Sequence, residues 1–259
     1  MVDSRRARTL GFSDLLRLID ERSTAFCAAV AAAPSLDAPV PTCPGWTLFD
    51  LVEHLGSRRR GWVATIAAGP DATARAEPPG PDAPRERDAL LTWMAESTQL
   101  MVDALRAAGP DRGCWAWWTK AQTPRTIGTV ARHQLHEMAM HTHDAQLTAG
   151  VDHEVPVEIA LDGVDEFLFT VTSNSSPWPH EPAAVDIHAS EGRSWRVRMS
   201  AETGAQAERL DPAAAPADAS MTGTAQELVL TLFGRFDFGA LKVEGDAEQF
   251  ERLATWEPE

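Results

Sequence analysis

The sequence contains little cysteine and no long hydrophobic run. Its three cysteines, Cys27, Cys43 and Cys114, include no C-x-x-C pair, so neither a disulfide framework nor a cysteine zinc site is suggested. Cys43 lies in a proline-rich loop, where a structural role is favoured over a redox role. No stretch approaches the roughly eighteen apolar residues that a membrane span requires, and Asp14 and Arg17 fall where a signal peptide would be uninterruptedly apolar. We therefore expect a soluble, cytoplasmic protein with no membrane partner.

Positive charge is scarce as well. The chain has 23 Lys and Arg residues against 38 Asp and Glu residues, which gives a formal net charge of −15 at pH 7. Nucleic acids and anionic membranes are bound by basic faces that displace counterions, so this balance argues against both as partners. Small molecules are the expected partners, and we expect a monomer or a small homo-oligomer. The 259 residues, 44% of them hydrophobic, suffice for one large domain or two small ones.

The first 150 residues carry the apolar spacing of amphipathic helices. Ser13 is the expected N-cap of the first helix, and Thr47 with Asp50 forms a weak capping box at the start of the second. Gly109 and Pro110 end the third helix. The predicted helices span residues 12–33, 48–68, 85–108 and 127–149. Four helices of this length indicate a bundle, and bundle cores commonly hold metal sites between facing helices.

The residues after Gly150 mix strands with helices. Residues 155–173 have helical spacing, and the alternating segments 184–190 and 194–200 flank a Glu-Gly-Arg turn that predicts a hairpin. The remaining predicted elements are a strand at 219–223, a helix at 224–235, a strand at 240–246 and a helix at 247–256. This mixture predicts a small α+β domain. We therefore expect two domains, a helical bundle at residues 1–150 and an α+β domain at residues 151–259.

The fourth predicted helix places polar side chains at steps of four. His133, Glu137 and His141 fall on one helical face, and Asp144 follows His141 by three residues. Glu137 and His141 could converge on one cation, with Asp144 accepting the second ring N–H of a bound imidazole. This pattern is half of a metal site and lacks a further ligand. The alternative is a solvated polar helix face, which the spacing alone does not exclude.

Two separated motifs resemble a known family. VPTCPGWTLFDLVEHLG (residues 40–56) and EMAMHTHDAQLTAG (residues 137–150) resemble the N-terminal domain of the maleylpyruvate isomerase family of mycothiol-dependent enzymes. The resemblance implies a DinB-like four-helix bundle that binds a divalent metal, typically zinc. It also implies His54, Glu137 and His141 as the metal ligands, so that the second helix supplies the ligand that spacing alone lacks.

Two later motifs extend the resemblance to the second half of the chain. ASMTGTAQELVLTLFGR (residues 219–235) and LKVEGDAEQFERL (residues 241–253) are similar to the family's C-terminal domain, a small sheet with helices related to sterol-carrier-like folds. The four motifs occur in the family's order and span most of the chain. The chain departs from the family's residue pattern at two positions. It has His133 where the family often has an arginine, and His143 where the family often has an aromatic residue. Both are expected near the metal face, so the substrate need not be maleylpyruvate.

The implied site would support thiol chemistry. Two imidazoles and one carboxylate leave an open position on zinc, where a thiol, mycothiol in this family, could be held as thiolate at neutral pH. The thiolate would attack a small, anionic electrophile. Rotation of the adduct and loss of the thiolate would give isomerisation, whereas retention of the thiol would give an S-transferase. The ligand set leaves open a hydrolase, an iron-dependent oxygenase, and a non-catalytic small-molecule binding or resistance protein.

Other residues could complete the site. Arg235 matches a family arginine that could bind an anionic substrate, with a helix C-terminal charge as an equal alternative. Asp144 is expected to orient a ligand. Trp46 would line the pocket mouth or, as favoured, hold its loop on the second helix, and His133 would be a pocket acid or base or, as favoured, a surface histidine. Three tryptophans in residues 113–126 cover the end of a core, the commoner role, or form a pocket wall.

Overall fold

The chain forms two compact units. The computed structural model describes residues 9–77, 80–211 and 215–256. The helical unit contains residues 10–117 and 125–155, and the sheet unit contains the other described residues, among them 118–124. The predicted domain boundary near residue 150 stays a prediction.

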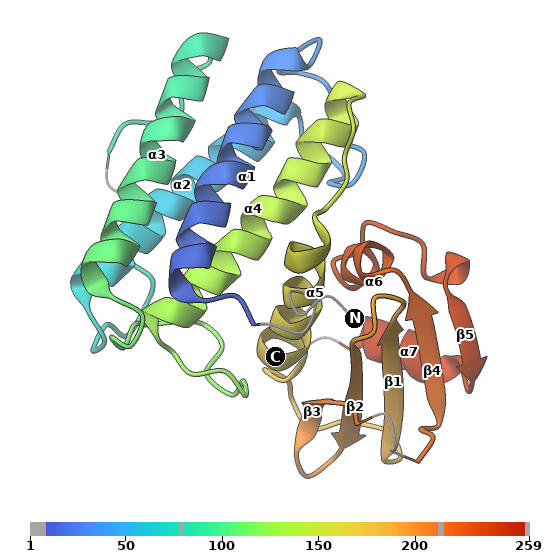
Figure 1. The fold of residues 1–259 in the computed structure, drawn as a ribbon. Helices are drawn as coiled ribbons and strands as arrows, with labels where there is room; N and C mark the ends of the chain where they lie inside the picture. The colour runs from blue at the N-terminus through green and yellow to red at the C-terminus, as the bar shows by residue number, and fades with distance from the viewer. Residues whose placement is uncertain (1–8, 78–79, 212–214, 257–259) are drawn as a thin grey trace, which may run out of the picture. The chain divides into compact units, whose positions relative to one another are not determined.

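The described part of the helical unit is built from four helices (Figure 1). They are α1 Phe12–Ala32, α2 Leu48–Ala68, α3 Arg87–Ala108 and α4 Ile127–Ala149. The four predicted helices are therefore confirmed, and both ends of α2 and α4 are as predicted. α1 packs against α3 and α4, and α2 packs against α3. Apolar side chains such as Phe26, Leu51 and Met94 are fully buried in the core of this bundle.

The start of α1 differs from the prediction. Ser13 was the expected N-cap, but the helix begins at Phe12 and its N-cap is Gly11. The Asp14 carboxylate accepts a hydrogen bond from Gly11 N at 3.3 Å, which satisfies an N–H group that the helix leaves unpaired. Ser13 therefore lies inside the first turn, and its prediction as the cap was wrong. α3 begins two residues later than predicted, because the Glu86 carboxylate accepts N–H groups of its first turn.

A capping box fixes the start of α2, as predicted. Thr47 Oγ1 accepts a hydrogen bond from Asp50 N at 3.3 Å, and Asp50 Oδ2 accepts one from Thr47 N at 2.8 Å. In the preceding loop, Val40 N donates to the Trp46 carbonyl oxygen at 3.0 Å, and Gly45 adopts a left-handed φ of 84° that favours glycine. The loop and the capping box together hold Trp46 and the first turns of α2 in a defined position.

The sheet unit contains a five-stranded sheet in the order β3-β2-β1-β4-β5. The strands are β1 Ala183–Ala189, β2 Ser194–Ser200, β3 Gly204–Arg209, β4 Ala219–Gly223 and β5 Lys242–Gly245. β1 and β4 are parallel, and the other neighbours are antiparallel. The predicted hairpin is confirmed as β1–β2, with Ile187 opposite Trp195. β3 was not predicted, because its sequence GAQAER contains no β-branched or aromatic residue.

Helices accompany this sheet (Figure 1). They are α5 Val157–Glu166, the π-helix η1 Phe167–Thr172, α6 Ala225–Leu232, the 3₁₀-helix η2 Phe238–Ala240 and α7 Glu248–Thr255. α6 packs against α5, and α7 packs against β1. The predicted helix over residues 155–173 is confirmed at residues 157–172, and its second half is a π-helix. The predicted α+β character is confirmed.

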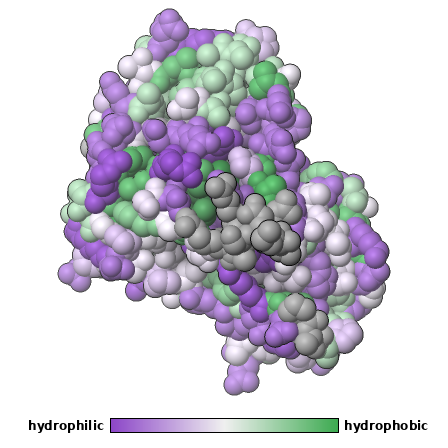
Figure 2. Space-filling view, in the orientation of Figure 1, coloured by the Kyte–Doolittle hydropathy of each residue, from purple (hydrophilic) through white to green (hydrophobic). Residues whose placement is uncertain are grey.

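The surface agrees with the composition. Hydrophilic side chains cover much of the face of the molecule drawn in Figure 2, as the surplus of Asp and Glu leads one to expect. Some large hydrophobic side chains are nevertheless exposed, among them Leu100 and Trp117. Within the described residues, no helix combines the length and the apolar character that crossing a bilayer requires.

Candidate metal centre

Three side chains from two helices meet at one point. His54 lies on α2, two turns from its capped start, and Glu137 and His141 lie one turn apart on α4. Each offers a ring nitrogen or a carboxylate oxygen, and these atoms lie within 4.8 Å of one another. The structure thus brings together the three residues that were predicted as metal ligands.

The spacing of these atoms suits a small divalent cation. His54 Nε2 and Glu137 Oε1 lie 3.6 Å apart, which is beyond good hydrogen-bonding distance. Two ligand atoms at 2.0–2.2 Å from a tetrahedral zinc ion are themselves about 3.3–3.6 Å apart. Two imidazoles and one carboxylate, with a fourth position left open, are also a donor set of catalytic zinc sites. The residues present therefore fit a zinc-like ion.

Asp144 supports the ring of His141 from behind. Its Oδ2 lies 2.8 Å from His141 Nδ1, which leaves Nε2 of that ring for a metal ion. The Asp144 carboxylate is fully buried and also accepts hydrogen bonds from Thr42 Oγ1 at 2.6 Å and from Cys43 Sγ at 3.5 Å. Its position is the one that the predicted orienting role requires, and the role itself stays a prediction.

The surroundings of Glu137 keep it ionised. Burial alone would raise the pKa of its carboxyl group, but the polar contact with His54 and the electrostatic influence of His133, His141 and His54 outweigh burial and lower the pKa to about 2. Gln134 Nε2 donates a hydrogen bond to Glu137 Oε2 at 2.6 Å, while Oε1 faces His54. At neutral pH the carboxylate is therefore charged and oriented to bind a cation.

A buried arginine lies beside these residues. Arg59 donates hydrogen bonds to Ser23 Oγ at 2.9 Å, to Thr98 Oγ1 and to Met138 Sδ at 2.7 Å, and so links α2 to the three other helices. Burial lowers the pKa of Arg59 to about 10, against the opposing effect of the Glu137 charge. Arg59 therefore remains a cation at neutral pH and balances the Glu137 carboxylate from within the bundle.

Trp46 covers one side of the ligand rings. Its ring centroid lies 4.8 Å from that of His54 and 6.4 Å from that of His141, and its plane is 22° from the plane of His141. The same tryptophan is fixed by its loop on the start of α2. Both predicted roles of Trp46, holding the loop and lining the pocket, are thus compatible with where it lies.

A cavity of about 390 Å³ opens beside the ligands. It is lined by His54, Arg58, Trp62, Arg75, Trp115, Trp117, His133 and Glu137. The ring of His133 lies 6.3 Å from Trp62 and 5.9 Å from Trp117, so His133 faces this cavity, where an acid or base would be useful. Trp115 and Trp117 line this cavity, as the less favoured pocket-wall alternative requires, whereas Trp118 is buried, as the favoured core role requires.

The chain matches family models in both of its halves. Residues 16–146 match the mycothiol maleylpyruvate isomerase N-terminal domain, and residues 158–252 match the MDMPI C-terminal domain. The chain belongs to the mycothiol maleylpyruvate isomerase family. The resemblance indicated by the sequence motifs is therefore confirmed, and the relationship is to a family of enzymes.

Two solved structures share the fold of this family member. A mycothiol-dependent maleylpyruvate isomerase is 15% identical, and a histidine-to-alanine mutant of such an isomerase is 14% identical. Each gives a TM-score of 0.59 and covers 91% of this chain and 93% of its own. At this identity the likeness shows the fold alone, and it confirms the predicted fold class. No curated protein matches the chain.

The family resemblance also singled out Arg235 and His143. Arg235 belongs to the sheet unit, where its Nη1 donates to the Phe233 carbonyl oxygen at 2.6 Å, and its predicted role in substrate binding stays a prediction. His143 was expected near the metal face, which was wrong. Two residues along a helix turn the side chain by about 200°, so His143 points away from the face of His141 and its Nδ1 contacts the His153 carbonyl oxygen at 2.9 Å.

A second group of potential ligands shares one histidine with the first. Cys43, His141 and Asp144 also offer atoms that lie within 4.8 Å of one another. In this group, however, Asp144 Oδ2 already accepts the Cys43 thiol and contacts His141 Nδ1. A metal ion there would have to displace these contacts, which favours the group formed by His54, Glu137 and His141.

Sequence reasoning missed several residues of the site. Arg58 follows His54 by four positions and Gln134 precedes Glu137 by three, so helical spacing could have found both. Arg75 comes from an irregular loop and Arg59 from a run of three arginines, a pattern that ordinarily faces solvent. No local signal distinguishes either of these two residues.

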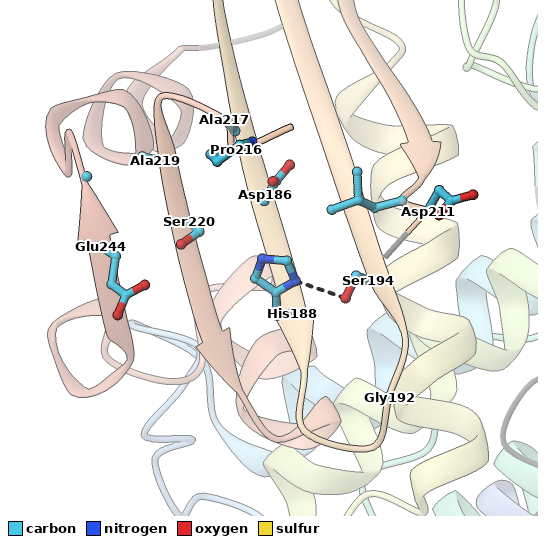
Figure 3. Close-up of a pocket in the computed structure, with 12 residues that line it drawn as sticks. Asp186, His188, Gly192, Ser194, Asp211, Pro216, Ala217, Ala219, Ser220 and Glu244 are labelled. Atoms are coloured by element: carbon cyan, nitrogen blue, oxygen red, sulfur yellow. Dashed lines mark hydrogen bonds between the residues drawn. The ribbon is translucent and has the colours of Figure 1, made fainter. Parts of the chain in front are cut away.

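A separate cavity of about 590 Å³ lies in the sheet unit (Figure 3). Two of its polar side chains are held by hydrogen bonds: Asp186 Oδ1 accepts from Arg196 Nε at 2.7 Å, and His188 Nδ1 lies 2.9 Å from Ser194 Oγ (Figure 3). None of the predicted site residues lines it. This cavity therefore does not compete with the metal centre as the candidate site.

Proposed function

We propose that the chain is a zinc-dependent enzyme that uses mycothiol as cosubstrate and catalyses isomerisation of, or S-transfer to, a small anionic electrophile. The observation that carries this proposal is the convergence of His54, Glu137 and His141 beside a cavity, with Asp144 behind one ligand. The similar solved structures are of an enzyme described as a mycothiol-dependent maleylpyruvate isomerase, which supports the thiol and the reaction class.

The chain's own residues would hold and shape the reaction site. His54, Glu137 and His141 would ligate the metal and leave one position open. When bound, zinc would act as a Lewis acid that lowers the pKa of a thiol and keeps it as thiolate. Asp144 would fix the tautomer and direction of the His141 ring, and Trp46 would limit the access of water to the ligand rings.

The proposed reaction conserves atoms and electrons. The thiolate adds to one carbon of an activated double bond, a C–S bond forms, and the electron pair passes to the activating group of the substrate. The remaining C–C single bond can rotate, and cleavage of the same C–S bond returns the thiolate and the isomer. Where His133, which lines the cavity, instead supplies a proton to the adduct, the thiol stays attached and the result is S-transfer.

The metal content of purified protein tests the proposed ligand set. We expect about one zinc ion per chain in the wild type, and its loss in His54→Ala and Glu137→Ala with an unchanged circular dichroism spectrum. Glu21→Ala is a matched control, because Glu21 is an exposed glutamate on α1 that pairs with Arg17. Full metal occupancy in either ligand variant would show that the proposed set is wrong.

Other experimental results would support a different function. Iron in place of zinc, with activity that depends on O₂, would indicate an oxygenase. Zinc that never takes a thiol ligand would indicate a hydrolase. Recovery of unchanged ligand from a protein without metal would indicate a binding protein.

A further inference from the structure

Two arginines line the cavity beside the proposed metal ligands. Arg58 follows His54 by one turn of α2, so both side chains lie on one helical face. Arg75 comes from the loop that follows α2. Neither arginine forms an ion pair with a described carboxylate, whereas the neighbouring Arg60 lies 3.8 Å from Glu96. Two cations thus face the cavity with their charge available to a ligand.

The position of Arg75 is set by contacts of its loop with α2. Ala76 N donates a hydrogen bond to Thr65 Oγ1 at 3.2 Å, and this hydroxyl donates to the Gly61 carbonyl oxygen at 2.8 Å. A Cβ atom on Gly61 would lie only 3.5 Å from Arg75 Nε, so the guanidinium group packs closely on the helix at this glycine. The loop therefore presents Arg75 from a fixed point beside α2.

The charges in this cavity favour an anion. Its lining contains two guanidinium groups and one carboxylate, that of Glu137, which is a proposed metal ligand. An adjoining cavity of about 650 Å³ shares His54, Arg58 and Arg75 with it. The acidic residues of that adjoining cavity are Asp50, Glu53 and Glu77. These three do not line the tryptophan-lined cavity, so its lining carries two positive charges against one negative charge, beside apolar walls that strengthen their effect.

We infer that Arg58 and Arg75 bind the anionic group of the electrophile, as a carboxylate subsite inside the helical unit. This inference rests on the proposed function. A guanidinium group offers a planar fork of donors that matches a carboxylate. The rings of Trp62, Trp115 and Trp117 supply flat apolar walls for the carbon skeleton next to it. The assignment differs from the cation suggested by family resemblance, which belongs to the sheet unit.

Binding of a small carboxylate to zinc-loaded protein tests this subsite. The probes are maleate and its uncharged dimethyl ester, and the dissociation constants come from calorimetric titration of the wild type, Arg58→Gln, Arg75→Gln and the double variant. We expect each single variant to bind maleate about tenfold more weakly, as for a lost charge-assisted hydrogen bond, and the double variant more weakly still. Binding of the ester should not change, and Arg58→Lys should recover part of the loss.

Matched measurements make the result decisive. Arg106→Gln is the control, because Arg106 is an exposed arginine on α3 that pairs with Asp103 at 2.8 Å, and it should bind maleate like the wild type. Wild-type protein that binds maleate no more tightly than the double variant would overturn the inference. Weaker thiol binding with unchanged maleate binding would also overturn it, because the arginines would then serve the thiol.

Zinc content and thiol binding of the same proteins separate this inference from the proposed function. If zinc content and thiol binding are normal and maleate binding is the same in the wild type and the arginine variants, only the carboxylate subsite is wrong. If the wild type holds neither zinc nor thiol, the proposed function is wrong, and the maleate comparison, made on the metal-free proteins, still decides whether the two arginines bind a carboxylate.

Discussion

Replacement of Asp144 with asparagine tests how the structure supports a metal ligand. The Asp144 carboxylate is fully buried, lies 2.8 Å from His141 Nδ1 and accepts a hydrogen bond from Thr42 Oγ1 at 2.6 Å. Asparagine has nearly the same size and keeps one acceptor oxygen, but it lacks the charge that fixes the tautomer of the His141 ring. Loss of such a partner typically weakens metal binding about 10- to 100-fold. This corresponds to about 1.4–2.8 kcal/mol of binding free energy.

Competition with a chromophoric zinc chelator at pH 7 measures this loss. Asp103→Asn is the matched control, because Asp103 is an exposed carboxylate on α3, and its zinc affinity should equal that of the wild type. Asp144→Asn should also lower the free energy of unfolding by about 1–3 kcal/mol, since buried hydrogen-bonding groups lose a charged partner.

Equal zinc affinity of folded Asp144→Asn and Asp103→Asn would show that Asp144 does not support metal binding through His141. If Asp144→Asn fails to fold, Thr42→Val offers a second test, because it removes one hydrogen bond to Asp144 and leaves the contact with His141. We expect a loss of zinc affinity in Thr42→Val that is measurable but smaller. An unchanged zinc affinity of Thr42→Val would contradict the idea that the loop containing Thr42 holds Asp144 in position to orient His141.

Three further predictions concern stability. Folding lowers the pKa of Glu137 from its ordinary value of 4.5 to about 2, so its contribution to stability is present above about pH 4.5 and is lost as the pH falls toward 2. In urea unfolding of metal-free protein, the free energy of unfolding of Glu137→Gln should therefore fall less steeply below pH 4.5 than that of the wild type. Equal pH profiles of the two proteins would contradict this. A Cβ on Gly56 would lie 2.0 Å from the Trp93 ring, so Gly56→Ala should cost at least about 1–3 kcal/mol, and an unchanged melting temperature would refute this packing of α2 on α3. Thr47→Ala removes a cap and should cost about 1 kcal/mol in thermal unfolding, whereas Thr47→Ser should stay close to wild type.

Sequence predicted the elements whose signals are local. Both ends of α2 and α4 follow from caps and from uninterrupted helical spacing, and the β1–β2 hairpin follows from alternation around a glycine turn. The faces of Glu137, His141 and Asp144 follow from the same helical geometry. Their convergence with His54 came from family resemblance, because no spacing relates residues on different helices.

The features that the sequence did not predict depend on contacts between residues that are distant in sequence. Pairing of β3 depends on its neighbour β2, since GAQAER has no strand preference of its own. Arg59 is buried because Ser23, Thr98 and Met138 accept its donors, and these partners are distant in sequence. The cavity lining could not be predicted either, because Arg75 reaches it through tertiary contacts of an irregular loop.

In the proposed function, a metal ion held by His54, Glu137 and His141 takes a thiol as its further ligand. Titration of mycothiol into cobalt-substituted protein, followed by visible absorption, tests this directly. We predict a sulfur-to-cobalt charge-transfer band that saturates at about one thiol per metal ion in the wild type and that is absent in Glu137→Ala. A wild-type protein that binds cobalt but never develops this band at saturating thiol would show that the bound metal takes no thiol ligand.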